Sequence, residues 1–263
     1  MSSEYFVGRQ YHIGVSPGDI AQNILLCGDL ERAKKTAQRF DENSIRFQGS
    51  HREFVTFTGT FKKIPVTVMA TGIGTDNTEI AVIEASQCVE YPTFIRIGSC
   101  GAIRNDVHVG DLVISYRALP RENTSSFYLP EGTIVNGTPK VVRALEDTAR
   151  RLGYRAHVGT TCSTSSFYGG QGREVPGFPI RDEAKRDKLF PQLLALGVLN
   201  FEMETSALYT LAVISTRGIR AGSVCAVFAE RQEGKGFDLD IMAEVERRCI
   251  DVGLEAIVSL AHK

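Results

Sequence analysis

Two carboxylates lie on either side of a methionine where an apolar segment turns into a helix. In the stretch NFEMETSALYTLA, Glu202 and Glu204 flank Met203, after the apolar run GVLNF and before a helix that is apolar from Ala207 onward. An ionised carboxylate in an apolar setting loses hydration that a partner must replace. The pair therefore either holds a ligand here or supplies the negative charge that the helix dipole favours at a helix start. From these residues alone, both interpretations stay open.

One arginine interrupts a strand whose other side chains are apolar or threonine. Arg96 lies in TFIRIG, directly before the Gly98-Ser99 pair. A guanidinium in that position needs an anion, which is either a phosphate bound through two parallel hydrogen bonds or a carboxylate in a structural ion pair. Arg32, which is four residues beyond Gly28 and one turn into its helix, could reach the same point. These residues predict an oxyanion pocket.

Glycines follow three of the expected strands, in the segments 27–29, 71–74 and 97–101. In open α/β sheets, ligands bind beyond the carboxyl ends of strands, where glycines let backbone amides approach an anion. Each loop taken alone is weak evidence, because a tight turn explains it more readily than a ligand does. None matches a P-loop or the G-x-G-x-x-G fingerprint, which argues against a nucleoside triphosphate or dinucleotide ligand.

The cysteines and histidines show no metal or nucleophile pattern. No two cysteines form a C-x-x-C pair, so we expect buried thiols in a cytoplasmic protein, with neither a zinc site nor a disulfide framework. Cys100 has no nearby base in the sequence, which argues against a nucleophilic role. His108 and His157 lack ligand spacing, and His12 is uninformative by itself. The scattered cysteines are Cys27, Cys88, Cys100, Cys162, Cys225 and Cys249.

The elements that must position these residues alternate between short apolar strands and amphipathic helices. This alternation predicts a single α/β domain over residues 1–263, a three-layer α/β/α fold with a central mixed sheet. Thr138 and Pro139 should begin one helix, which Gly153 should end. Residues 117–137 read as irregular, and the last helix should begin at about 238. We expect strands at 24–28, 53–61, 65–72, 93–98, 111–115, 157–167, 197–201 and 220–229, and helices at 29–40, 75–90 and 138–153.

Composition excludes several classes of protein. The 263 residues are 43% hydrophobic and carry a formal net charge of -1, and no run of Lys and Arg exceeds two residues. A nucleic-acid-binding groove normally needs a basic excess, so we expect no nucleic-acid partner. The N-terminus lacks the apolar core of a signal peptide, and no run of about 18 apolar residues predicts a membrane span.

Several motifs, taken together and in order, resemble the nucleoside phosphorylase family, which cleaves purine and pyrimidine ribosides, and most closely its uridine phosphorylase branch. The resemblance covers nearly the whole chain, and the combination of the Q-x-R and E-M-E motifs is specific. The motifs are CGDLER with Gly28 and Arg32, SHREF with Arg52, RIGSCGAI with Arg96, Ser99 and Cys100, FYGGQGR with Phe167, Gln171 and Arg173, and FEMETSAL with Glu202, Met203 and Glu204.

The resemblance implies a role for each motif. Gly28, Arg32, Arg96 and Ser99 would bind phosphate, joined by Arg52 from a neighbouring subunit. Cys100, Met203, Glu204 and a neighbour's His12 would bind ribose, with Glu202 in a secondary role. Phe167, Gln171 and Arg173 would bind the base. The expected catalytic residues are Arg96, Glu204, Gln171 and Arg173. Glu204 would be held by substrate and helix amides rather than by a permanent cation.

The same resemblance implies reversible phosphorolysis of uridine to uracil and ribose 1-phosphate, with no cofactor and with inorganic phosphate as co-substrate. Active sites would be shared across a dimer, which can be part of a hexamer. A monovalent cation site near Glu53 stays open, because Asn77 replaces a serine there. Alternatives are a broader nucleoside phosphorylase, a nucleoside hydrolase, and a non-catalytic nucleoside-binding or storage protein.

Three positions depart from the family pattern. Cys100 replaces a threonine, Glu230 an asparagine that is common there, and Leu30 a proline. Purine-specific relatives carry an aspartate near positions 229–231, which this sequence lacks. The missing aspartate counts against a purine substrate.

Overall fold

The computed structural model describes residues 8–232 and 239–262. Within these residues one sheet contains ten strands. Their bounds are β1 (Asn23–Cys27), β2 (Phe47–His51), β3 (Phe54–Phe61), β4 (Ile64–Ala70), β5 (Thr93–Ala102), β6 (Leu112–Arg121), β7 (Val135–Asn136), β8 (Ala156–Thr164), β9 (Val198–Glu202) and β10 (Arg220–Glu230).

The helices follow the expected alternation with the strands. Thr138 is the N-cap of α3, Pro139 is its first residue, and Gly153 follows its end with φ 72°, so both predicted boundaries are confirmed. The bounds are α1 (Leu30–Ala37), α2 (Thr75–Cys88), α3 (Pro139–Arg151), α4 (Glu183–Ala195), α5 (Thr205–Ile214) and α6 (Leu239–Ala261), with short 3₁₀ turns η2 (Ser125–Phe127) and η3 (Gly169–Gln171).

The sheet is mixed, and part of it closes on itself. Its strand order is β10-β6-β8-β9-β5-β1-β4-β3-β2, and β10 also pairs with β5. Strands β5, β10, β6, β8 and β9 therefore form a ring, from which β1, β4, β3 and β2 extend as an open sheet. The closure joins strands far apart in the sequence, so local sequence patterns do not reveal it.

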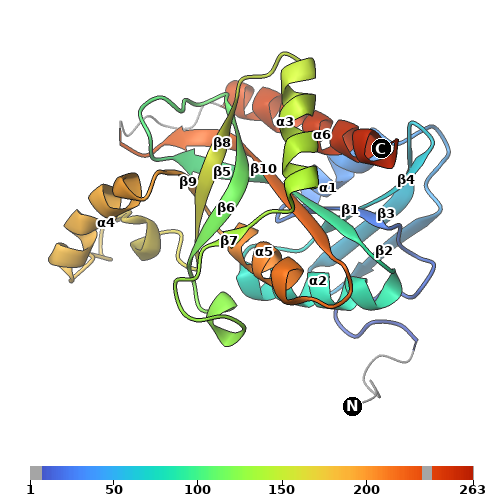
Figure 1. Ribbon diagram of the computed structural model, residues 1–263, viewed down its shortest axis with the longest axis horizontal. Helices are drawn as coiled ribbons and strands as arrows, with labels where there is room; N and C mark the ends of the chain where they lie inside the picture. The colour runs from blue at the N-terminus through green and yellow to red at the C-terminus, as the bar shows by residue number, and fades with distance from the viewer. Residues whose placement is uncertain (1–7, 233–238, 263) are drawn as a thin grey trace.

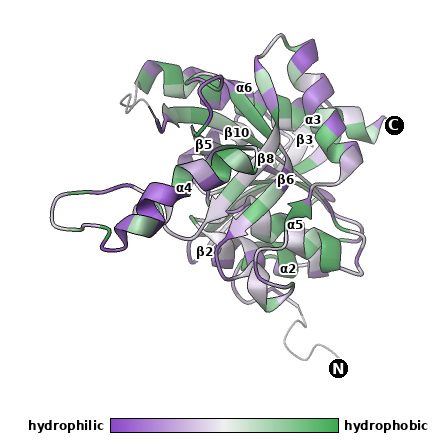
Figure 2. Cartoon of the chain, turned by 60° about the vertical axis from the view of Figure 1, so that its left-hand side comes forward, coloured by the Kyte–Doolittle hydropathy of each residue, from purple (hydrophilic) through white to green (hydrophobic). Residues whose placement is uncertain are grey.

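Helices cover both faces of the sheet, as Figure 1 shows: α1, α3 and α6 on one side, and α2 and α5 on the other. One hydrophobic cluster includes Ala33, Leu145 and Cys249 from the first group, and another includes Val82 and Leu208 from the second. The predicted three-layer α/β/α arrangement is thus confirmed. Helix α4 projects from this body (Figures 1 and 2), and Leu189 and Leu193 are its buried residues.

The segment predicted to be irregular, 117–137, is partly regular. Strand β6 continues to Arg121, and β7 and η2 lie within the rest of the segment. After a register shift beyond Ser115, β6 pairs in parallel with β8 as far as Thr164. Strand β10 pairs only with the first residues of β6, at 112–114. Pro120 therefore occupies an edge-like position, where the missing N–H is tolerated.

Two strand ends also differ from the prediction. The structure continues β5 through Gly98 to Ala102, because β10 pairs with its second half, including Cys100 with Val227. Strand β8 ends at Thr164, so 165–167 leave the sheet. Edge strand β2 was not predicted, and the expected start of the last helix, residue 238, lies outside the described residues. Within the described ranges, no helix is long and apolar enough to cross a membrane.

Candidate active site

A cavity of about 440 Å³ opens beside the second half of β5, near the carboxyl ends of β1, β9 and β10. It brings together the predicted residues except His12 and Arg52. Those in its lining are Gly28, Arg32, Arg96, Ser99, Cys100, Phe167, Gln171, Arg173, Glu202, Met203 and Glu204. They come from segments spread over most of the chain, so their convergence follows from the topology of the sheet.

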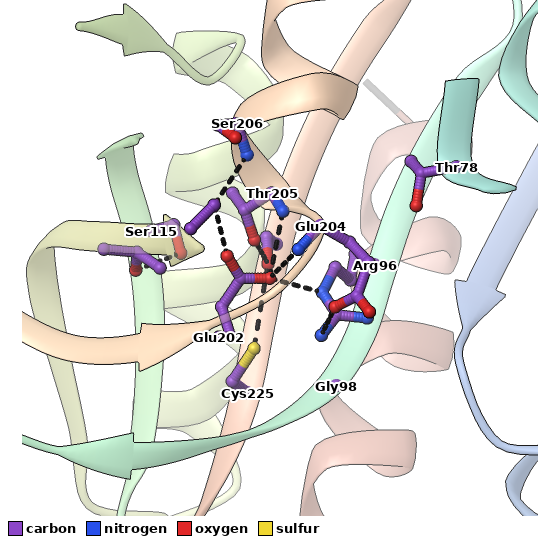
Figure 3. A network of polar contacts seen from close by, with 12 residues as sticks. Thr78, Arg96, Gly98, Ser115, Glu202, Glu204, Thr205, Ser206 and Cys225 are labelled. Carbon is purple, nitrogen blue, oxygen red and sulfur yellow. Dashed lines mark hydrogen bonds and ion pairs between the residues drawn. The ribbon is translucent and has the colours of Figure 1, made fainter. Parts of the chain in front are cut away.

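Arg96 is bound to both carboxylates of the E-M-E motif (Figure 3). Its Nε donates to Glu202 Oε2 at 2.9 Å, and its Nη2 lies 2.5 Å from Glu204 Oε2. Burial favours the neutral guanidine, but Glu204 and Glu202 outweigh it and raise the pKa of Arg96, so the side chain stays charged. The expectation that Glu204 has no permanent cation is therefore wrong.

The two carboxylates have different supporting contacts. Glu202 Oε2 accepts from the backbone N–H groups of Glu204 and Thr205, each at 2.9 Å, and Glu202 Oε1 accepts from the Ser163 hydroxyl. Glu202 thus accepts from the free amides at the start of α5. The sequence analysis had expected Glu204 to make these contacts. Glu204 Oε1 instead accepts from Gly74 N at 2.8 Å. A carboxylate has further lone pairs, so Glu204 can still accept from a ligand.

Gly98 allows Arg96 to adopt this position. A Cβ at residue 98 would lie 2.6 Å from Arg96 Nη2 and 3.0 Å from Cys225 Sγ. The guanidinium therefore folds back over the glycine, along the face of β5 that lines the cavity. The glycine serves this close approach rather than the predicted turn, because β5 continues through it.

The cavity lining also contains a second group of polar side chains, from η3 and the residues next to it. Gln171 is buried, and the Arg173 guanidinium lies 4.2 Å from the centroid of the Phe167 ring. Arg173 Nε is buried and has no hydrogen-bond partner among the described residues. A buried donor left unpaired destabilises the protein unless a ligand supplies an acceptor. This part of the site is therefore suited to a ligand with acceptor atoms.

Arg231 supports this group from outside the cavity lining, and the sequence analysis did not identify it. Its Nη2 donates to the Gln171 carbonyl at 2.9 Å, and its Nη1 donates to Gln171 Oε1 at 3.3 Å. Burial, followed by the nearby charge of Arg173, lowers the pKa of Arg231 to about 10. Gly101 leaves room for this side chain. The available sequence signal was a charged residue at the end of the apolar strand 220–229.

His12 and Arg52 lie together outside the cavity lining of their own chain. His12 Nδ1 is 2.6 Å from Glu84 Oε1. The exposed Arg52 donates from Nη2 to the Tyr11 hydroxyl at 3.1 Å and packs over the Tyr11 ring. The structure thus places them in one cluster, but not with the other predicted site residues.

Glu230, which departs from the family pattern, and Glu53 and Asn77, which were considered for a cation site, lie outside the cavity lining. Glu230 accepts from Val109 N at 3.1 Å and lies 3.5 Å from His108 Nδ1, outside the cavity lining. Glu53 and Asn77 both lie against Gly72. Among the described residues, no group of three or more His, Cys, Asp and Glu is arranged to hold a metal ion.

All six cysteines are free and buried, as predicted. Burial raises the pKa of the Cys100 thiol well above its usual value. The thiol is therefore protonated at neutral pH, which supports the argument against a nucleophilic role.

Comparisons with known proteins identify the family of the chain. The family model of the phosphorylase superfamily matches residues 23–259. Uridine phosphorylase of Thermococcus kodakarensis is 45% identical over 225 residues, covering 85% of this chain and 78% of the relative. Uridine phosphorylase of Escherichia coli is 31% identical over 255 residues, covering 94% and 96%. A nucleoside phosphorylase structure from Trypanosoma brucei, described as showing uridine phosphorylase activity, matches with TM-score 0.88 and 27% identity over 96% of this chain and 98% of that one. The chain belongs to the phosphorylase superfamily.

Proposed function

We infer that this protein is a pentosyltransferase that cleaves uridine reversibly with inorganic phosphate, giving uracil and ribose 1-phosphate. The observation that carries this inference is the polarity of the cavity. Arg32 from α1 and Arg96 from β5 line it, Gln171 and Arg173 line it from η3 and the residues just after, and Glu204 is bound to Arg96. A nucleoside and phosphate together present matching groups: an anion, sugar hydroxyls, and a base with carbonyl acceptors. The relatives' recorded activities agree with it.

The arrangement suits a reaction that develops opposite charges. Cleavage of the glycosidic bond leaves positive charge on the sugar and negative charge on the base. Arg32 and Arg96 position phosphate as both nucleophile and counter-charge, while Gln171 and Arg173 stabilise the departing base. Glu204 orients the ribose through its remaining lone pairs. This mechanism needs no cofactor and no covalent enzyme intermediate, and phosphate is its co-substrate.

Phosphate dependence is the first prediction, and it tests the function directly. Uracil release from uridine should require added phosphate, because the nucleophile is phosphate rather than water. The assay follows uracil with and without phosphate, at catalytic and at stoichiometric protein concentrations. Release without phosphate would indicate a nucleoside hydrolase. No release with excess protein and saturating phosphate would indicate a nucleoside-binding protein instead.

We also propose that two subunits complete each active site, within a dimer or a hexamer built from dimers. This proposal rests on the family resemblance of SHREF and is supported by the exposed position of Arg52 away from its own cavity. Arg52 and His12 of one subunit would then reach the cavity of its neighbour. The six free, buried cysteines support placing the enzyme in a reducing compartment such as the cytosol.

Mixed assemblies test the shared site. Arg52→Ala and Gln171→Ala homomers should each be poor enzymes, because every site lacks one of the two residues. Hybrids formed after denaturation and remixing contain some sites with both residues intact, so activity should return. Each variant denatured and remixed with itself is the control. Verified hybrids with no more activity than these controls would argue against a shared site.

A further inference from the structure

Contacts with the protein itself orient the Arg32 side chain. Its side chain is 5% exposed, its Nε lies 2.9 Å from Glu246 Oε1, and its Nη1 donates to the Ile97 carbonyl at 3.3 Å. A guanidinium has more N–H groups than these two bonds use, and Arg32 lines the cavity. The contacts with Glu246 and Ile97 therefore leave donors that can face a ligand.

Glu246 comes from α6. It is buried, and its second oxygen, Oε2, lies 2.5 Å from Lys35 Nζ. Arg32 and Lys35 are three residues apart on α1, so both face the same carboxylate. Glu246 itself does not line the cavity. Its contacts tie α1 to α6 and leave the carboxylate satisfied on both oxygens.

We infer that Glu246 is a positioning residue for phosphate: it holds the Arg32 guanidinium in the orientation that binds the anion, without touching substrate. The inference rests on the proposed function, because it assumes that Arg32 binds phosphate. A free arginine side chain loses considerable rotamer entropy when it is ordered. By holding Arg32 in advance, Glu246 removes that loss from the binding step, an effect specific to the anion and not to the nucleoside.

The test separates phosphate from uridine. In Glu246→Ala, the KM for phosphate should rise about tenfold, because the released rotamer freedom corresponds to roughly that factor. The KM for uridine and kcat at saturating phosphate should stay within about twofold. Glu246→Gln keeps the shape but replaces a charge-assisted bond by a weaker one, so its phosphate KM should rise by about threefold. Calorimetric titration with inorganic phosphate should give the same order of affinities.

Glu255 provides a matched control on the same helix. Its side chain is 15% exposed, and it pairs with Lys62 and Arg151, away from the cavity. Glu255→Ala removes a carboxylate with two cationic partners from the same helix, as Glu246→Ala does, yet phosphate KM should stay within about twofold. If Glu246→Ala does not fold, as judged by circular dichroism, Glu246→Gln decides by the same criteria.

The outcomes distinguish this inference from the proposed function. An unchanged phosphate affinity in the folded Glu246 variants, or an equal rise in uridine KM, would overturn the positioning role while leaving phosphorolysis intact. If the unmodified protein binds phosphate but does not cleave uridine, the proposed function fails, and the calorimetric comparison still decides the role of Glu246. If it binds no phosphate, both fail.

Discussion

Replacing Arg96 by alanine should lower kcat/KM for uridine phosphorolysis by about 10²–10³-fold or more, as loss of a preorganised electrostatic contact does. The guanidinium lines the cavity and binds Glu202 and Glu204 at the same time. The substitution therefore removes a cation for phosphate and also releases Glu204 from its fixed position. Both losses act on the transition state, so we expect kcat to fall as well as affinity.

The ion pairs make a stability measurement necessary. Removing one member of a buried pair typically destabilises a protein by about 3–5 kcal/mol, because the remaining charge is left uncompensated. Thermal unfolding and circular dichroism should show whether the variant is folded at the assay temperature. Arg96→Lys keeps a positive charge but cannot contact both carboxylates in parallel, so it should be more stable than the alanine variant and still a poor enzyme.

Arg217 supplies a control for the loss of an arginine elsewhere. Its Nε donates to the Ser86 carbonyl at 2.6 Å, and it does not line the cavity. Arg217→Ala should keep near-normal kcat/KM. Near-normal phosphorolysis by a folded Arg96→Ala variant would show that Arg96 does not contribute to catalysis.

The sequence located Arg96 because a charged side chain in an apolar strand is unusual, but it could not decide between two anions. Phosphate and a structural carboxylate were equally suitable partners. The structure shows the carboxylates as actual partners and places the guanidinium in the cavity, so the two interpretations are compatible. Glu204 was expected to accept from the backbone amides at the start of α5, but Glu202 does so. Both glutamates lie next to the helix start in the sequence, and only the path of the backbone selects Glu202.

Residues that act through long-range packing were harder to find. Arg231 and Glu246 carry no local motif, and their partners Gln171 and Arg32 are distant in sequence. The ring closure depends on β10 pairing with both β5 and β6, which apolar periodicity cannot reveal. Strand and helix alternation, in contrast, is a local property, and it predicted the three layers correctly.

Base choice should depend on the orientation of the Gln171 amide. Uracil presents two carbonyl acceptors with an N–H donor between them. Gln171 can accept from that N–H and donate to one carbonyl, while Arg173, whose Nε has no partner in the described structure, donates to the other. Arg231 already donates to Gln171 Oε1 at 3.3 Å, and the oxygen can accept a second hydrogen bond. An amide flip would place two donors against each other.

Cytidine should therefore be a very poor substrate. It replaces one carbonyl by an amino donor and the N–H by a bare acceptor, so Arg173 faces a donor. With Arg173 at the position of the replaced carbonyl, Gln171 faces two acceptors of cytosine, and flipping its amide, which Arg231 opposes, would match only one of them. Buried polar groups left unpaired in this way can discriminate by about 10⁴ or more. Inosine should also be poor, because no aspartate lies at 227–231 to protonate a purine base.

Two variants separate these contributions to the uridine-to-cytidine ratio of kcat/KM. Arg173→Ala should narrow the ratio by about 10-fold to 100-fold, mainly by harming uridine, since it removes a hydrogen bond from a charged donor. Arg231→Ala should narrow the ratio by freeing the Gln171 amide to flip, so cytidine should lose less activity than uridine.

Measurements of kcat/KM for uridine, cytidine and inosine with the unmodified enzyme and both variants test this assignment. If inosine is the best substrate of the unmodified enzyme, or if Arg173→Ala leaves the ratio unchanged, Gln171 and Arg173 do not select the base. An unchanged ratio in Arg231→Ala alone would mean that the Gln171 amide is held by other contacts.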